Sequence, residues 1–177
     1  ESGIVSASMV QNAVDAVYSS IPVQCVDIDL SPMQAQMTSR LLSVLDQNGM
    51  TMATLSLDGR QALQVGICSL HLQNLNWAES AFGVAHQALP GNEVVLQGLE
   101  KVALLKADDV LRLHWLEAQL RIDPDNPELL RTHAHILVQQ GDENAEKDVR
   151  RLEALGLDTP ADRSLLAGLR HRAGSSN

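Results

Sequence analysis

Apolar residues near the start of the chain recur every three or four positions, which is the spacing of one face of a helix. The stripe consists of Val10, Val14, Val17 and Ile21. It predicts an amphipathic helix from about Ser6 to Ser20. Pro22 should end this helix, because proline lacks the amide hydrogen that a helix interior needs. Since the stripe has to be buried, the helix needs an apolar surface elsewhere in the fold.

The next segment predicts a second helix behind a non-helical stretch. Residues 23–30 alternate loosely between apolar and polar side chains and are predicted to be extended. Residues 31–34, Ser-Pro-Met-Gln, match a capping box that starts a helix. This helix should end near residues 48–49, with three apolar side chains facing inward: Met37, Leu41 and Val44. Residues 50–57 fit either a short strand or a helical turn.

From residue 59 onward the pattern is helical, and its breakers are regularly spaced. Pro90 and Pro124 are 34 residues apart. A fixed period in this range is the signature of a stacked-repeat protein. With each proline at position 32 of a unit, residues 59–160 divide into three repeats: 59–92, 93–126 and 127–160. Residues 1–58 then form an N-terminal helical segment with an irregular linker, and residues 161–177 form a final helix and tail.

The first repeat carries the most informative residues. Small residues occupy positions 8, 20 and 27, and a large one occupies position 24: Gly66, Ala78, Ala85 and Phe82. This pattern resembles the tetratricopeptide repeat (TPR). In that family the small residues let two antiparallel helices approach closely, and the large residue fills the space between neighbouring units. The third repeat supports the register, with Ala134 at position 8 and Gly141 at position 15, where the family turns between its helices.

The other two repeats depart from the family pattern. The second has Glu100, Arg112 and Gln119 where small residues are expected, and the third needs a one-residue deletion in its second helix. The repeats are therefore degenerate. A helical hairpin array of another solenoid family stays open as an alternative, because Ala and Leu at helical spacing occur in any such array.

The resemblance implies an all-α fold: a right-handed superhelix of antiparallel helix pairs, with N-terminal helices before it and a capping helix after it. Helix caps agree with these boundaries. Asn92 and Asn126 are good N-caps, and each stands before the start of a repeat. Thr159 and Pro160 begin a last helix whose apolar residues should cover the end of the array: Leu165, Leu166 and Leu169.

Composition narrows the range of partners. The chain has 177 residues, a formal net charge of −9 and only 2% aromatic residues. The charge disfavours nucleic acid and anionic membranes, and the scarcity of rings disfavours base-stacking surfaces. No run of 18 apolar residues is present, so no membrane span is predicted. We expect another protein or a peptide segment as the partner.

The search for catalytic or metal-binding groups produces no candidate set. His133 and His135 are two apart on a predicted helix, so their side chains point about 200° apart and cannot share a metal. The other histidines in the repeats are isolated and are expected to be structural or solvent-facing: His71, His86 and His114. No nucleophile elbow or glycine-rich phosphate loop occurs. We therefore expect no enzyme activity, no cofactor and no metal.

The two cysteines leave two interpretations open. Cys25 and Cys68 lie 43 positions apart without a CxxC motif. They are either two unpaired, buried side chains or the partners of one disulfide in an oxidising compartment. The first residue is Glu1 rather than methionine, so the N-terminus does not reveal the compartment.

The resemblance implies a binding groove on the concave face of the first helices of each pair, where the family binds extended peptides or partner helices. Ten residues at the corresponding positions are our predicted groove: Leu63, Ile67, Leu70, Gln97, Lys101, Leu104, Leu105, Arg131, His135 and Val138. Because most of them are aliphatic or uncharged, an apolar segment suits the groove better than an acidic C-terminal peptide. The alternative is that the N-terminal helices fold over this face and fill it.

These features predict a non-enzymatic adaptor or chaperone that binds a protein segment during assembly of a bacterial envelope, pilus or secretion machine. An envelope or periplasmic location is favoured over a cytoplasmic one. Two alternatives stay open. One is a cytoplasmic chaperone of the type III secretion translocator class, which this chain resembles in size, acidity and repeat layout. The other is a self-associating structural module, which would make the chain a homo-oligomer.

Overall fold

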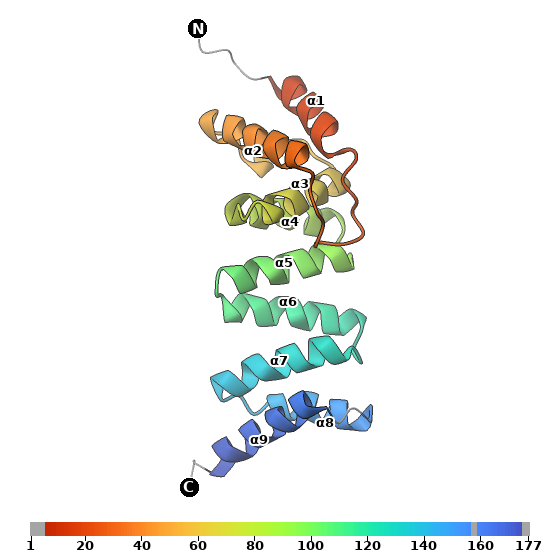
Figure 1. The fold of residues 1–177 in the computed structure, drawn as a ribbon, viewed down its shortest axis with the longest axis vertical. Coiled ribbons are helices and arrows are strands. Elements are labelled where there is room, and N and C mark those ends of the chain that lie inside the picture. The colour runs from red at the N-terminus through yellow and green to blue at the C-terminus, as the bar shows by residue number, and fades with distance from the viewer. Residues whose placement is uncertain (1–5, 157–158, 175–177) are drawn as a thin grey trace. The chain divides into compact units, whose positions relative to one another are not determined.

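The structure is a computed structural model that describes residues 6–156 and 159–174 (Figure 1). Within these residues the chain is helical, and neighbouring helices pack in pairs. The helices are α1 (Ala7–Tyr18), α2 (Pro32–Gln47), a 3-10 turn η1 (Met52–Thr54), α3 (Gly59–His71), α4 (Leu75–Ala88), α5 (Glu93–Leu105), α6 (Asp109–Ile122), α7 (Pro127–Gln140), α8 (Ala145–Ala154) and α9 (Pro160–Gly174). The all-α fold class predicted from the sequence is confirmed.

Capping residues determine where the two N-terminal helices, α1 and α2, begin. The Ser6 hydroxyl accepts a hydrogen bond from the first turn of α1, and all four residues of the predicted stripe are buried. Ser31 and Gln34 form the predicted capping box of α2, with the serine hydroxyl and the glutamine carboxamide each accepting a backbone N–H. The region predicted to be extended has no regular secondary structure.

One prediction about α2 is wrong. Met37 and Val44 were expected to face inward, but they are 38% and 40% exposed, and only Leu41 of the predicted trio is buried. The buried face instead consists of Thr38, Leu41, Leu42 and Leu45. Because α2 has apolar residues along two neighbouring lines, periodicity alone did not reveal which line packs against the fold.

The first helices of the three predicted repeats start at a constant interval of 34 residues, at Gly59, Glu93 and Pro127. The residue before each start is an N-cap whose side chain accepts a backbone N–H of the first turn. α7 ends at Gly141, whose φ of 75° lies in the left-handed region that glycine adopts without strain. The local sequence therefore determines where these helices begin and where α7 ends.

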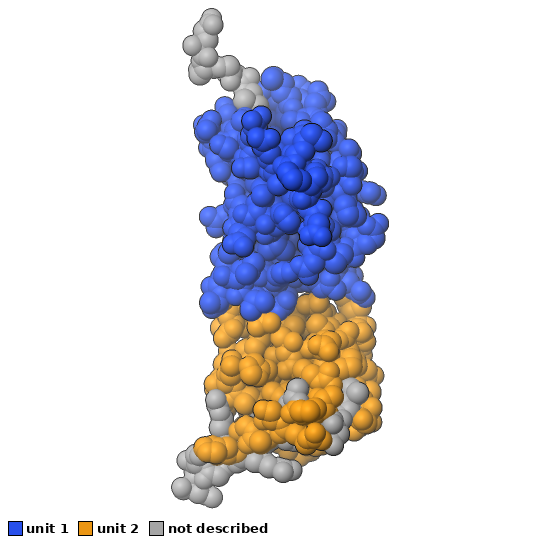
Figure 2. Space-filling model, in the orientation of Figure 1, with its two compact units in different colours: residues 1–107 blue, residues 108–177 orange. Residues whose placement is uncertain are grey.

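The chain divides into two compact units, unit 1 (residues 1–107) and unit 2 (residues 108–177) (Figure 2). In unit 1, α3 packs on α4, and α5 packs on both. The Phe82 ring fills the space between α3 and α5. A Cβ atom on Gly66 would come within 2.9 Å of this ring, and one on Gly98 within 2.4 Å. Both glycines are therefore required by close packing.

In unit 2, α7 packs on both α6 and α8, and α9 packs on α7 and α8. Ala134, Val149 and Leu165 form an apolar cluster, one residue from each of the last three helices, and Val138 packs against it. The side chains of Leu166 and Leu169, which were predicted to cover the end of the array, lie outside the described part. No helix in the described residues is long and apolar enough to cross a membrane.

Candidate protein-binding face

The segment between α1 and α2 lies across α3 and α5 of unit 1. We call residues 21–30 the strap. Figure 1 shows it running from the end of α1 past α3 to the level of α5 and then back to α2. Gln64 on α3 donates from Nε2 to the backbone carbonyl of Ile21 at 3.0 Å. His71 Nδ1 lies 3.0 Å from the carbonyl of Ile28, so this nitrogen carries the proton and donates.

Two further contacts hold the strap. Asp27 forms an ion pair with Lys101 on α5. Val26 is only 8% exposed, so its side chain is the apolar anchor of the strap's middle. Because the Asp27 side chain is 71% exposed, its ion pair stabilises the strap by about 1 kcal/mol or less. The strap is thus an irregular segment held through its backbone carbonyls, one carboxylate and the buried side chains of Ile21 and Val26.

This arrangement corrects the predicted groove in the first repeat. Leu63, Ile67 and Leu70 were expected to line an open surface, but all three are buried. The physical reason is that α3 contacts four other helices, α1, α2, α4 and α5, which leaves little of its surface free. The N-terminal helices α1 and α2 therefore pack on α3, which agrees with the alternative expectation that the N-terminal helices fold over this face.

A row of predicted groove residues on α5 stays accessible. We call it the α5 stripe: Gln97, Lys101, Leu104 and Leu105. Their spacing of four, seven and eight residues places them on one face of the helix. Leu104 and Leu105 are 44% and 48% exposed, which is unusual for large apolar side chains side by side. Lys101, one turn before them, is the α5 residue that pairs with Asp27 of the strap.

The predicted groove residues of the third repeat have other roles. Arg131 binds Asp162 of α9 through two hydrogen bonds of 2.7 and 3.2 Å, and this bond holds the pKa of Asp162 well below its usual range. Val138 packs in the apolar cluster of unit 2. His135 is exposed and contacts Gln139. The docking of α9 therefore uses two of the three predicted residues.

Unit 2 also contains a histidine arrangement that the sequence interpretation missed. His133 Nδ1 lies 2.6 Å from the carboxylate of Asp148 on α8, and its Nε2 lies 3.8 Å from that of Glu117 on α6. Burial lowers the pKa of His133, but the hydrogen bond and charge of Asp148, aided by Glu117, outweigh burial and raise it. The His133 side chain thus links three successive helices.

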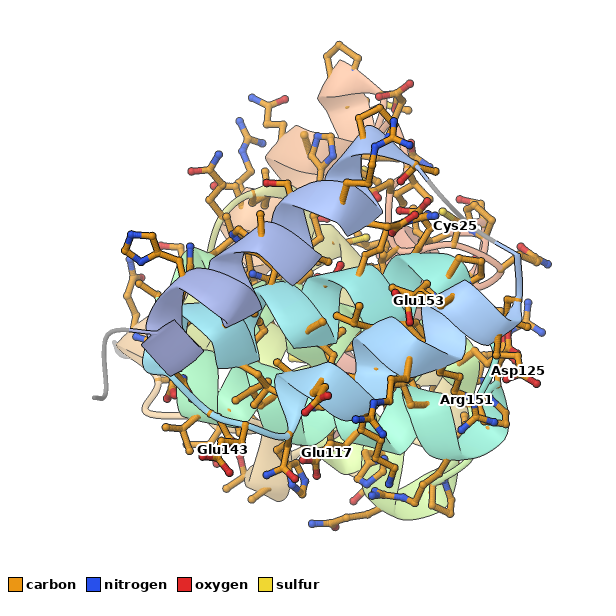
Figure 3. All side chains as sticks on the ribbon, turned by 90° about the horizontal axis from the view of Figure 1, so that it is seen from below. Cys25, Glu117, Asp125, Glu143, Arg151 and Glu153 are labelled. Carbon is orange, nitrogen blue, oxygen red and sulfur yellow. The ribbon has the colours of Figure 1, made fainter. Side chains whose placement is uncertain are left out.

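A cavity of about 500 Å³ opens beside this histidine between α6, α7 and α8. It is lined by carboxylates and by the cations Arg121, Lys147 and Arg151. Figure 3 shows Glu117 and Arg151 along one edge of unit 2, with Asp125 next to the arginine that it pairs with at 2.7 Å. Opposite charges balance around the cavity, so it does not select a ligand of one sign.

A sequence signal for the His133–Asp148 pair existed. The predicted turn at residues 141–142 makes the two helices of this hairpin antiparallel. Residues at similar distances before and after that turn then lie side by side, and His133 and Asp148 meet that condition. Spacing along the sequence does not reveal this pair, because its two members lie on different helices.

The cysteines are both free: Cys25 is exposed and Cys68 is buried. The structure contains no disulfide between them, and the other expectation, two buried unpaired cysteines, holds for Cys68 but not for Cys25. Burial raises the pKa of the Cys68 thiol to about 12, which keeps it protonated and unreactive. Within the described residues no group of three or more His, Cys, Asp or Glu side chains could hold a metal ion.

Comparison of the chain with family models, with curated proteins and with solved structures gave no match in any of the three. The candidate site is therefore argued from its own geometry: the face made by α3 and α5, the strap that lies on it, and the α5 stripe beside the strap.

Proposed function

We propose that this chain is a non-enzymatic adaptor or chaperone, built from degenerate TPR-like helix pairs, that binds an extended protein segment across α3 and α5. The observation that carries the proposal is the strap. It is held by side-chain donors on its backbone carbonyls and by a cation on its carboxylate. A helical surface that holds an irregular segment of its own chain has the donors and the charge that a partner's segment needs.

The α5 stripe supplies the apolar part of this proposed surface. Leu104 and Leu105 are adjacent, exposed and one turn from Lys101. A partner that covers them removes apolar area from water, and each square ångström so removed contributes about 25 cal/mol. The proposed setting is the one that the resemblance implies, the assembly of a bacterial envelope, pilus or secretion machine.

The test changes the charge of the stripe in the full chain. Leu104→Glu with Leu105→Glu is compared with Met37→Glu with Val44→Glu, a matched pair on α2 with similar exposure. Each variant is expressed in the native organism, checked by circular dichroism, and crosslinked for mass spectrometry. We expect the stripe variant to lose at least tenfold of the crosslinked partner and the α2 variant to retain it. Equal retention by two folded variants would show that α5 is not the binding surface.

The alternatives predict different outcomes of the same experiment. A self-associating module would give crosslinks between copies of this chain, and sedimentation at increasing concentration would show a dimer that the stripe variant lacks. A chaperone of the type III translocator class would crosslink to an export substrate before its secretion. In either case the partner's identity, rather than the fold, decides between them.

A further inference from the structure

We propose that the strap is an internal ligand that competes with the partner for the α3–α5 face, and that the partner's segment carries an acidic residue next to apolar ones. This inference rests on the proposed function and adds two things to it. It names the chemistry of the segment that binds, and it names the contact that must open before binding.

The first argument is that the middle of the strap can leave without undoing the fold. Its ends are fixed, because α1 and α2 both pack on α3. Between them, Val26, Asp27 and Ile28 make the contacts, and the neighbouring Cys25 and Asp29 are exposed. The restraints on the middle are one half-exposed ion pair, one hydrogen bond to a carbonyl and the burial of the Val26 side chain, each modest by itself. Release of the middle therefore leaves both helices docked.

The second argument is that the strap covers the face incompletely. It pairs with Lys101 but leaves Leu104 and Leu105 about half exposed, one turn further along α5. An incoming segment that replaces Asp27 at Lys101 and also covers these leucines gains apolar burial that the strap lacks. That gain is what lets a partner displace a ligand that is already in place.

The contacts of the strap specify the partner. Lys101 takes a carboxylate, and His71 Nδ1–H takes a backbone carbonyl of the residue next to the acid. The place of Val26 takes an aliphatic side chain, because this residue is the apolar anchor of the strap. The partner is therefore a segment of extended or irregular backbone with an aliphatic–acidic pair, followed or preceded by further aliphatic residues that reach the stripe.

Competition by the strap lowers the apparent affinity for an external segment, and this decrease can be measured. A segment tethered at both ends acts at an effective concentration in the millimolar range. The apparent affinity of an external segment is reduced by the fraction of molecules in which the strap is open. Weakening the strap must therefore increase the affinity for an external segment without any new contact.

The experiment uses a dye-labelled peptide with the sequence of residues 20–31, with serine in place of Cys25, as the external segment. Its binding to the full chain is followed by fluorescence anisotropy. The release variant carries Val26→Ser and Asp27→Arg. The matched control carries the same charge exchange, Asp29→Arg, at an exposed position of the strap two residues from Asp27.

We expect the release variant to bind the peptide about tenfold more tightly than the wild type, and the control to bind like the wild type. The charge test uses a strap that cannot pair with either sign, with Val26→Ser and Asp27→Asn. In this chain Lys101→Asp should abolish the gain, and a peptide with Arg in place of Asp27 should regain affinity, because its charge is complementary to Asp at position 101. If the double release variant does not fold, Asp27→Arg alone should give a gain of about threefold.

Three results overturn the inference, and they differ in what they say about the proposed function. Equal affinity of wild type, control and release variant would mean that the face binds segments without internal competition, so the proposed function would stand. Absence of binding to every folded variant would mean that the face takes no segment from outside, and the proposed function would fail with the inference. Binding that ignores Lys101→Asp also overturns it, because the peptide would then lie elsewhere.

Discussion

The polar groups buried in unit 1 are neutral, whereas those buried in unit 2 include charged ones. In the described part of unit 1 the buried polar residues are Thr38, Gln64 and Ser69. In unit 2 they are Gln119, His133, Asp148 and Asp162. Both units are built from the same kind of helix pair, so the repeat pattern does not determine how the helices are held together.

The difference has physical consequences. Unit 1 depends on close apolar packing around Phe82, whose contribution changes little with pH. Unit 2 buries three ionisable side chains, and each of them needs its partner, because an unpaired buried charge is costly. Unit 2 should therefore respond to pH where unit 1 does not. Each unit holds one tryptophan, Trp77 in α4 and Trp115 in α6, so fluorescence can follow the two separately.

The largest effect is expected at the centre of unit 1. Phe82→Ala removes a fully buried ring and should lower the free energy of unfolding of this unit by about 3–5 kcal/mol. Urea unfolding followed by Trp77 fluorescence, in a Trp115→Phe background, measures it. Met9→Ala, at an exposed position, is the control and should change little. A loss below about 1 kcal/mol for Phe82→Ala would mean that unit 1 does not depend on this ring.

The glycine next to the ring gives the second effect. Gly98→Ala places a Cβ atom 2.4 Å from the Phe82 ring and should cost about 1–3 kcal/mol. Gly83→Ala is the matched control: its Cβ would meet nothing within 4 Å, so it should stabilise the helix by up to about 1 kcal/mol. In a Phe82→Ala background the cost of Gly98→Ala should disappear. If the cost stays the same there, the clash with the ring is not its cause.

The third prediction concerns the charges of unit 2. The pKa of His133 is raised in the folded protein, so the pair with Asp148 stabilises fully below 6.5, the ordinary pKa, and less as pH rises through the folded value. Asp148→Asn should therefore cost about 1.5 kcal/mol near pH 6 and less at higher pH. Unfolding followed by Trp115 fluorescence in a Trp77→Phe background measures the difference.

The control for this prediction is His135→Gln, an exposed histidine on the same helix, which should leave the pH dependence unchanged. Unit 1, followed by Trp77, should show no such dependence over the same range. A pH-independent cost of Asp148→Asn would remove the proposed contrast between the two units, because the imidazolium would then not be the stabilising form.

The smallest effect is expected at the surface of unit 2. Arg150 and Glu146 form an ion pair of 2.6 Å between side chains that are more than half exposed. Glu146→Gln should cost about 0.5 kcal/mol or less, and the cost should vanish in 1 M salt. A cost as large as that of Asp148→Asn would mean that burial is not what distinguishes the important charges.

Much of the fold was predictable because its signals are local. A cap and the turn that it starts lie within four residues of each other, so Ser31, Asn92 and Asn126 show where α2, α5 and α7 begin. The stripe of α1 was also correctly predicted, because its apolar residues form a single line. On α2, two apolar lines compete, and the sequence did not reveal which of them packs against the fold.

The candidate site depends on groups that are far apart in the sequence. Lys101 meets Asp27, and His71 meets Ile28, across distances that no periodic pattern spans. The buried state of Leu63 depends on how many helices surround α3, and the pairing of His133 depends on a facing residue of another helix. The sequence by itself determined the ends of these helices, through hydrogen bonds within a single turn. Only the tertiary structure decided which helix faces are buried, because burial of a face depends on other helices and segments, distant in the sequence, that pack against it.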